Sequence, residues 1–233
     1  MLLRHGESVF NAAGVFTGLL DVDVSDRGRQ QARAAAKLLR AHGLVPERTW
    51  TSPMRRAAAT TDVVVGELGL DPATVTSTWR LAERDYGSLT GVPKHEARER
   101  YGPEGYLTVR RTLDGTPGTA TCEQAAAWPV APYTEPGSGL PEPGAGETLR
   151  DVIDRVAPLW PELRAELEAG RTVLVVAHGN SLRALCAVID ELTAHEVQEL
   201  NVPPAQPLVY RWVDGAPTPR GGRYLDDDAH VEV

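Results

Sequence analysis

Two short apolar runs, far apart in the chain, each end at a histidine followed by a glycine. Leu2-Leu3 precedes Arg4-His5-Gly6, and residues 173–177 precede His178-Gly179. The second run is continuous and rich in valine, which is typical of a parallel strand buried on both faces of a sheet. Ligands of open α/β sheets bind beyond the carboxyl ends of such strands. If both strands lie in one sheet, we expect the two histidines to face one pocket.

Helix and strand patterns alternate along the rest of the chain. Ser25 and Asp26 predict the start of a helix that Gly43 ends, and Ser52-Pro53 predicts the cap and first turn of the next helix. This alternation predicts a three-layer α/β/α fold, with a mostly parallel central sheet, helices on both faces and an inserted helical and loop cap. The other expected elements are strands at 49–51, 75–79 and 208–213, helices at 93–101 and 104–112, a helix at 147–169 kinked at Pro158, a helix after His178 and a helix opened by a capping box at Thr193–Glu196.

Length and composition limit the remaining possibilities. The 233 residues predict a single domain over 1–233, with the cap insertion at about 80–146, in which 114–146 is a long surface loop rich in proline and glycine. A net charge of −8 argues against nucleic acid as a partner. No apolar run approaches the roughly 20 residues of a membrane span, and no secretory leader precedes the first strand. Cys122 and Cys186 lack metal-ligand spacing, so we expect a reduced, cytoplasmic protein.

The residues at the two turns favour a phosphate ligand. Zinc would need three or four His, Cys or carboxylate ligands, and Arg4 would repel a cation, so we expect no metal. A guanidinium presents a planar fork of donors that matches phosphate oxygens, and Arg56 lies in the first turn of a predicted helix, where backbone N–H groups attract anions. A neutral imidazole is a competent nucleophile. We therefore expect His5 to be the nucleophile and His178 a transition-state donor.

Each of these residues also has a simpler explanation. A lone histidine at a strand end is more often structural than catalytic, but two such turns, one with Arg4 and the other with Asn180, favour catalysis. The stretch 81–87 offers Glu83 as general acid and base, since a proton must reach the leaving oxygen. From the residues of that stretch alone, an exposed charged loop is the better explanation. We expect Arg183 to form a structural ion pair.

Taken together, these residues resemble those of the cofactor-dependent phosphoglycerate mutases, within the histidine phosphatase superfamily. The resemblance rests on Arg4-His5-Gly6-Glu7-Ser8, Asn11, Phe16-Thr17-Gly18, Asp21-Val22-Asp23, Thr51-Ser52, Arg56, Glu83-Arg84, Tyr86-Gly87, Lys94, Arg110-Arg111 and Ala177-His178-Gly179-Asn180-Ser181. It runs from Leu2 to about Arg111 and resumes from about Glu147 to Val213.

The resemblance implies a role for each matching residue. His5 would carry the phosphoryl group, Arg4, Arg56 and His178 would hold it, and Glu83 would donate and accept the proton. The reaction would interconvert 3-phosphoglycerate and 2-phosphoglycerate in glycolysis and gluconeogenesis, primed by 2,3-bisphosphoglycerate and without a metal, in a homodimer. The small phosphorylated carboxylate would be bound by Ser8, Asn11, Thr17, Gly18, Tyr86, Lys94, Arg110, Arg111, Gly179 and Asn180.

Some segments depart from the family's pattern. Asp85 stands where the family usually has histidine and would lower the positive potential of the pocket, and 114–146 does not follow the family's usual sequence. The tail at 226–233 is short and acidic, whereas the family's longer tail tends to cover the site. A mutase must exclude water until its phosphoryl group returns. A histidine phosphatase acting on another small phosphate ester therefore stays open, as does a non-catalytic phosphate-binding module, although the latter would not need Glu83.

Overall fold

A six-stranded sheet forms the centre of the molecule in the computed structural model, which describes residues 1–225. Its strands lie in the order β3-β2-β4-β1-β5-β6. The first four strands in that order are parallel, while β5 is antiparallel to β1 and β6 is antiparallel to β5. The strands are β1 (Leu2–Arg4), β2 (Arg48–Thr51), β3 (Val75–Ser77), β4 (Val173–Ala177), β5 (Leu208–Val213) and β6 (Ala216–Tyr224).

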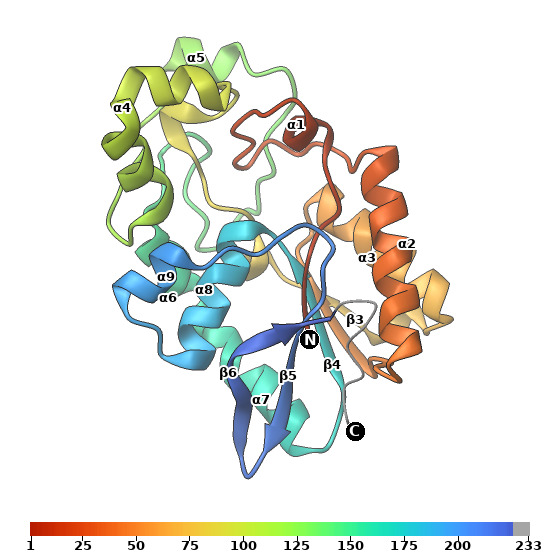
Figure 1. The fold of residues 1–233 in the computed structure, drawn as a ribbon. Coiled ribbons are helices and arrows are strands. Elements are labelled where there is room, and N and C mark those ends of the chain that lie inside the picture. The colour runs from red at the N-terminus through yellow and green to blue at the C-terminus, as the bar shows by residue number, and fades with distance from the viewer. Residues whose placement is uncertain (226–233) are drawn as a thin grey trace.

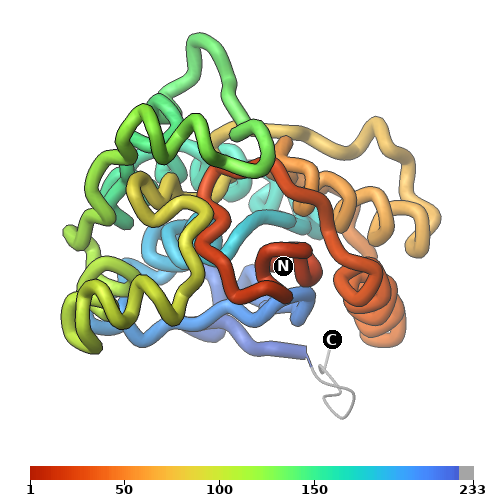
Figure 2. Tube along the Cα trace, turned by 90° about the horizontal axis from the view of Figure 1, so that it is seen from above, coloured from red at the N-terminus to blue at the C-terminus, as the bar shows by residue number. Residues whose placement is uncertain are grey.

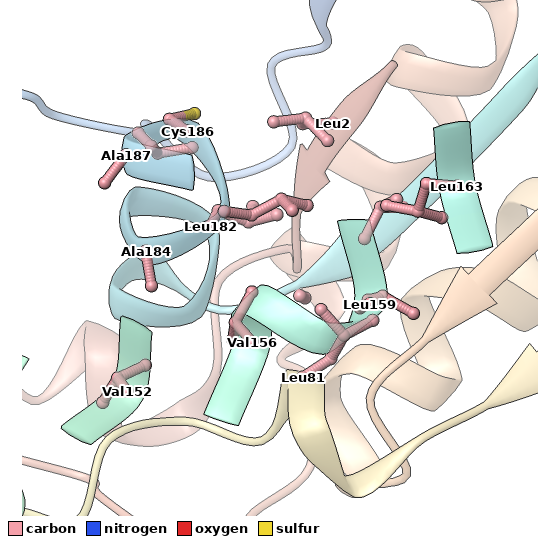
Figure 3. Packing of buried hydrophobic residues seen from close by; sticks show 14 of the residues in the cluster. Leu2, Leu81, Val152, Val156, Leu159, Leu163, Leu182, Ala184, Cys186 and Ala187 are labelled. Atoms are coloured by element: carbon pink, nitrogen blue, oxygen red, sulfur yellow. The ribbon is translucent and has the colours of Figure 1, made fainter. Parts of the chain in front are cut away.

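Helices cover both faces of this sheet (Figure 1). On one face, α2 (Asp26–Ala41) and α3 (Arg55–Leu68) enclose a cluster that includes Leu3 and Val176. On the other face, α6 (Leu149–Val156), α7 (Trp160–Glu168) and α8 (Gly179–Asp190) pack on Leu2 and Val175, and Figure 3 shows part of this larger cluster. Neighbouring residues of one strand thus pack into opposite layers, because successive side chains of a strand alternate between the two faces of the sheet. The predicted three-layer, mostly parallel fold is confirmed.

The carboxyl ends of the parallel strands lie beneath a set of helices (Figure 1), which Figure 2 shows from above. These are α1 (Val9–Ala12), α4 (Lys94–Arg111) and α5 (Cys122–Ala126), while α9 (Ala194–Glu199) packs against α4. Gly102, with φ 67° and ψ 170°, breaks α4 just before Pro103, so its two halves correspond to the two short helices expected there. Within residues 1–225, no helix is both long enough and apolar enough to cross a membrane.

Other local predictions need correction. The helix expected over 147–169 is interrupted at Pro158, where the kink is expected, but the interruption is a 3-10 turn, η4 (Ala157–Leu159), that divides it into α6 and α7. Ser52 does not cap α3: the N-cap position belongs to Met54, and the Ser52 hydroxyl contacts His178 instead. The strand expected over 75–79 stops at Ser77, where a turn leads into η2 (Trp79–Leu81).

Two further points concern the last part of the chain. The hairpin partner of β5, strand β6, was not expected from the sequence. The acidic tail at 226–233 lies outside the described residues. The remaining one-turn elements are η1 (Pro72–Thr74) and η3 (Gly87–Leu89).

Candidate active site

The two histidine turns meet at one edge of the sheet. Strands β1 and β4 are neighbours, with Arg4 opposite Ala177, so His5 and His178 follow adjacent strand ends. Their ring centroids are 5.0 Å apart and the ring planes are tilted by 60°. The backbone N–H of His5 also donates to the carbonyl of Ala177 at 2.9 Å. The expected meeting of two imidazoles from distant parts of the chain is therefore present.

His5 has the protonation pattern of a nucleophile. Its Nδ1 lies 2.6 Å from the carbonyl oxygen of Gly6, which can only accept, so Nδ1 carries the proton and Nε2 keeps its lone pair. Burial lowers the pKa of His5 well below the ordinary value, and the positive charges of Arg56 and Arg4 lower it further. The ring is therefore neutral near pH 7, as a nucleophilic imidazole must be.

His178 lies beside His5 but is not among the residues that line the cavity. Its Nε2 is 2.9 Å from the hydroxyl of Ser52, while its Nδ1 is buried and has no hydrogen-bond partner within residues 1–225. Burial, followed by the charge of Arg56, lowers the pKa of His178 well below its usual value. His178 is thus a buried, neutral imidazole that lies against His5 from outside the cavity lining.

A cavity of about 670 Å³, open to solvent, adjoins His5. Most of the residues expected to bind substrate line it, and one does not: Ser8 is buried outside the lining, where its hydroxyl accepts from the Asn11 N–H and caps α1. The expected residues in the lining are Arg4, His5, Asn11, Thr17, Gly18, Arg56, Glu83, Tyr86, Lys94, Arg110, Arg111, Gly179 and Asn180. The lining residues that sequence reasoning missed are Val15, Phe16, Arg183, Asn201 and Val202.

Two guanidinium groups lie close to His5. Arg56 is buried and donates to the carbonyls of Leu20 at 2.9 Å and Gly18 at 3.0 Å, while burial lowers its pKa to about 10. Arg4 donates to the carbonyl of Val202 at 3.0 Å, and its Nε is buried with no partner among the described residues. These contacts fix both guanidinium planes in advance, which favours binding of a planar set of phosphate oxygens.

Further cations gather elsewhere in the lining. Burial, followed by the charge of Arg110, lowers the pKa of both Lys94 and Arg111. Like charges crowded in this way repel one another, and a negatively charged ligand would relieve the repulsion. The hydroxyl of Thr17 is buried in the lining without a partner among residues 1–225, so it can also bind such a ligand.

Glu83 is the carboxylate that lines this cavity. Its Oε1 accepts from the backbone N–H of Arg84 at 2.8 Å and from the Asn180 Nδ2 at 3.1 Å, and the same amide nitrogen donates to the Tyr86 hydroxyl at 2.9 Å. Glu83 and Arg84 are buried, so the alternative of an exposed charged loop is wrong. The carboxylate is oriented by neighbouring groups, as a general acid and base requires.

One expectation about a neighbouring residue is wrong, and two further residues near the site have structural contacts. Arg183 forms no ion pair within the described residues; it donates to the Asn180 Oδ1 at 3.1 Å and to the carbonyls of Arg111 and Val197. Asp85 does not line the cavity, because its carboxylate accepts backbone N–H groups away from it. Gly6 lies directly against a neighbouring helix, since a Cβ there would lie 2.2 Å from the Gly28 carbonyl oxygen.

The missed lining residues carry little signal in the sequence. Asn201 and Val202 lie in an irregular segment before β5, and only the tertiary fold brings that segment to Arg4.

Within residues 1–225, no group of three or more His, Cys, Asp or Glu side chains is placed to hold a metal ion. Most of the charged groups that line the cavity are cations, which suit an anion.

Neutral paired imidazoles, a carboxylate and several guanidinium groups at the carboxyl edge of this sheet define an enzyme of the phosphohistidine type. The sequence pattern of the histidine phosphatase superfamily (branch 1) matches residues 1–126 and 111–221, and the chain belongs to this superfamily. It is 41% identical to a 2,3-bisphosphoglycerate-dependent phosphoglycerate mutase from Thermobifida fusca, over 100% of the chain and 95% of the relative. A mutase of the same name from Mycobacterium leprae (strain TN) is also 41% identical, over 100% and 94%. The chain is thus a member of the phosphoglycerate mutase family.

A solved structure shares the fold and differs in its named activity. A mycobacterial glucosyl-3-phosphoglycerate phosphatase in complex with VO3 superposes with a TM-score of 0.66 at 29% identity, covering 88% of both chains. The superfamily fold therefore carries enzymes named as mutases and enzymes named as phosphatases.

Proposed function

We propose that this protein is a phosphoglycerate mutase that interconverts 3-phosphoglycerate and 2-phosphoglycerate through a phosphohistidine on His5. The observation that carries the proposal is the neutral His5 ring, with Nε2 free, next to His178 in a cavity lined by cations and Glu83. Identity of about 40% to the named mutases over essentially the whole chain supports the same reaction.

The first chemical step belongs to His5 and Glu83. Nε2 of His5 attacks phosphorus, the bond from phosphorus to the leaving oxygen breaks, and Glu83 gives its proton to that oxygen. Arg4 and Arg56 would hold the phosphoryl oxygens meanwhile, and the family resemblance adds His178, which lies against His5. Preorganised donors of this kind stabilise developing charge. In the reverse step Glu83 accepts the proton of the attacking hydroxyl.

The remaining donors of the cavity suit the second acidic group of the substrate. Lys94, Arg110 and Arg111 would hold its carboxylate, and Thr17 offers a hydroxyl without another partner. 2,3-Bisphosphoglycerate fits this donor set because it has three acidic groups, and when bound it supplies the phosphoryl group that primes His5. Ser8 would act indirectly, through α1 and Asn11, and the other contacts would come from Gly18, Tyr86, Gly179 and Asn180.

A second candidate is hydrolysis of a small phosphate ester by the same intermediate. The openness of the cavity to solvent favours it, because water would reach the phosphohistidine. The similarity to a phosphatase of known structure supports it as well. Both candidates use the same first step and differ in what accepts the phosphoryl group.

A product assay separates the two candidates. The protein is incubated with 3-phosphoglycerate, with and without a catalytic amount of 2,3-bisphosphoglycerate, and 2-phosphoglycerate and inorganic phosphate are both measured. We expect primer-dependent 2-phosphoglycerate and little phosphate, and no product from His5→Ala. Release of phosphate without isomerisation would refute the mutase proposal, and a phosphoryl group that persists on His5→Ala would refute both candidates.

We also infer a homodimer in the cytoplasm, built from a single domain in which about 80–146 is inserted as a cap. The named activity of the relatives and the family resemblance support the assembly and the location. The cap supplies Glu83, Tyr86, Lys94, Arg110 and Arg111 to the cavity, which supports its assignment as part of one domain. Light scattering in solution and fractionation of the source cells test these points.

A further inference from the structure

Four buried charged residues lie behind the general acid, outside the cavity lining. They are two cations, Arg84 and Arg155, and two carboxylates, Asp85 and Glu147, and each is less than a tenth exposed. Charges of this kind are costly to bury unless they are paired and fully hydrogen-bonded. The two positive and two negative charges of the group balance. Its members contact residues 81–87, the stretch that carries Glu83, or the segments that pack against these residues.

Arg155 connects helix α6 to the backbone of that stretch. It forms a buried ion pair with Glu147, with Nε 2.9 Å from Oε1. Its NH2 donates to the carbonyls of Ala82 at 2.9 Å and Glu83 at 3.1 Å. Figure 3 shows the neighbouring Val156 beside Leu81, so apolar packing holds the same two segments together.

Asp85 connects a second segment to the stretch. Its backbone pairs with Glu147 in both directions: the Asp85 N–H donates to Glu147 Oε2 at 2.8 Å, and the Glu147 N–H donates to the Asp85 carbonyl at 2.9 Å. Its carboxylate accepts three more N–H groups, from Gly144 and Gly146 on Oδ2, both at 2.9 Å, and from Gly87 on Oδ1 at 3.1 Å.

The two glycines make this arrangement possible. Gly144 and Gly146 have φ values of 94° and 87°, which residues with a side chain rarely adopt, and the resulting turn aims both N–H groups at one carboxylate oxygen. A carboxylate has enough lone pairs for three donors. The imidazole of a histidine, which the family usually has at this position, could not accept three N–H groups. The departure at Asp85 and the departure at 114–146 therefore belong together.

We propose that Asp85 is a positioning residue that ties the 144–147 segment to the acid-bearing stretch and so holds Glu83 in place for proton transfer. This inference rests on the proposed role of Glu83 and deepens it. Asp85 acts through Glu83 and touches no substrate. Replacing a carboxylate oxygen of Asp85 leaves N–H groups of Gly87, Gly144 or Gly146 without an acceptor. The 144–147 segment then no longer holds the backbone of Glu83 in place, and the Glu83 carboxylate loses its alignment with the leaving oxygen.

The test compares two aryl phosphates of similar shape with different leaving groups. When the bond from phosphorus to oxygen breaks, 4-nitrophenolate leaves without a proton, whereas the oxygen of phenyl phosphate needs a proton from Glu83. The kcat/KM for phosphate release reports formation of the phosphohistidine on His5 in each case. We expect Asp85→Asn to lower kcat/KM for phenyl phosphate by roughly tenfold or more, within the range that general acids contribute. The value for 4-nitrophenyl phosphate should change by no more than about twofold.

Two reference variants calibrate this ratio. Glu83→Gln removes the proton directly and should give the same selectivity for the better leaving group. Combining Glu83→Gln with Asp85→Asn should add little further loss, because residues that act as a unit are not additive. Asp114→Asn is the matched control, since Asp114 is an exposed acid of the same insertion that pairs with Arg150, and it should leave both substrates unaffected.

The ratio of the two rates keeps the test decisive. Both are measured on one preparation, so any unfolded fraction cancels, and Asp85→Ser provides a second variant read in the same way. An equal loss on both substrates, or no loss on either, would overturn the proposal. Failure of the mutase proposal would appear separately, as wild-type protein that transfers phosphoryl groups from aryl phosphates but forms no 2-phosphoglycerate.

Discussion

Acidification should weaken the fold through the two histidines of the site. Both have pKa values well below the ordinary 6.5, because they are buried and lie near Arg56. The unfolded chain therefore binds these two protons first, and falling pH favours unfolding from about pH 6.5 downward, until the folded-state pKa values are reached. At pH 5.5 each neutral histidine costs about 1.4 kcal/mol relative to high pH, so the pair costs about 2.8 kcal/mol.

Urea unfolding at several pH values between about 8 and 5.5 measures this effect. Wild-type protein is compared with His5→Asn, His178→Asn and the double variant, in buffers free of phosphate. All other titrating groups are common to the four proteins, so differences between their pH dependences isolate the histidines. Each single variant should lose about half of the 2.8 kcal/mol dependence, and the double variant should lose all of it. Parallel curves for the four proteins would refute the assignment of neutral, buried imidazoles.

Three substitutions test other parts of the site. Glu83→Gln should lower kcat for isomerisation by about 10²–10⁴ while acid-labile phosphate still forms on His5 from a donor with a good leaving group; unchanged isomerisation in a coupled assay would contradict its role. Arg56→Lys should lower kcat/KM at least about tenfold, because a lysine cannot reproduce the two fixed bonds of the guanidinium to the carbonyls of Gly18 and Leu20. A kcat/KM equal to that of wild type would show that the guanidinium of Arg56 is dispensable. Thr17→Val should raise KM for 3-phosphoglycerate without lowering urea stability, because its hydroxyl has no partner among the described residues; a stability loss with unchanged KM would argue for a purely structural role.

The meeting of the two histidines was predictable because it depends on few assumptions. The valine-rich run at 173–177 is typical of a buried strand, and the first strand, though brief, ends at the same kind of turn. Carboxyl ends of neighbouring parallel strands share one edge of a sheet, so no detailed packing is required to bring the turns together. The boundaries of α2 were predictable because they depend on residues at the helix ends themselves. Ser25 accepts the Gly28 N–H at the start, and Gly43 follows the last turn with a positive φ.

The rest depends on contacts that are distant in sequence. Ser8 and Ser52 could each bind a ligand or cap a helix, and only the folded chain gives Ser8 to α1 and Ser52 to His178. Strand β6 contains Pro217, Pro219 and paired glycines, which have low strand propensity, and it forms because it pairs with β5 at the sheet edge. No local pattern indicates these outcomes.

The net charge of the chain and the charge of its cavity have opposite signs. Carboxylates outnumber cations, 32 to 24, yet six cationic side chains and the single carboxylate of Glu83 line the cavity: Arg4, Arg56, Lys94, Arg110, Arg111 and Arg183. Within residues 1–225 none of these cations forms an ion pair. The side-chain hydrogen bonds of Arg4, Arg56, Arg111 and Arg183 go to carbonyl and amide oxygens instead. Carbonyls orient a guanidinium without neutralising it, so the full positive charge stays available to an anion. An acidic surface with a cationic cavity thus admits small multivalent anions to the site, while the overall charge discourages large polyanions.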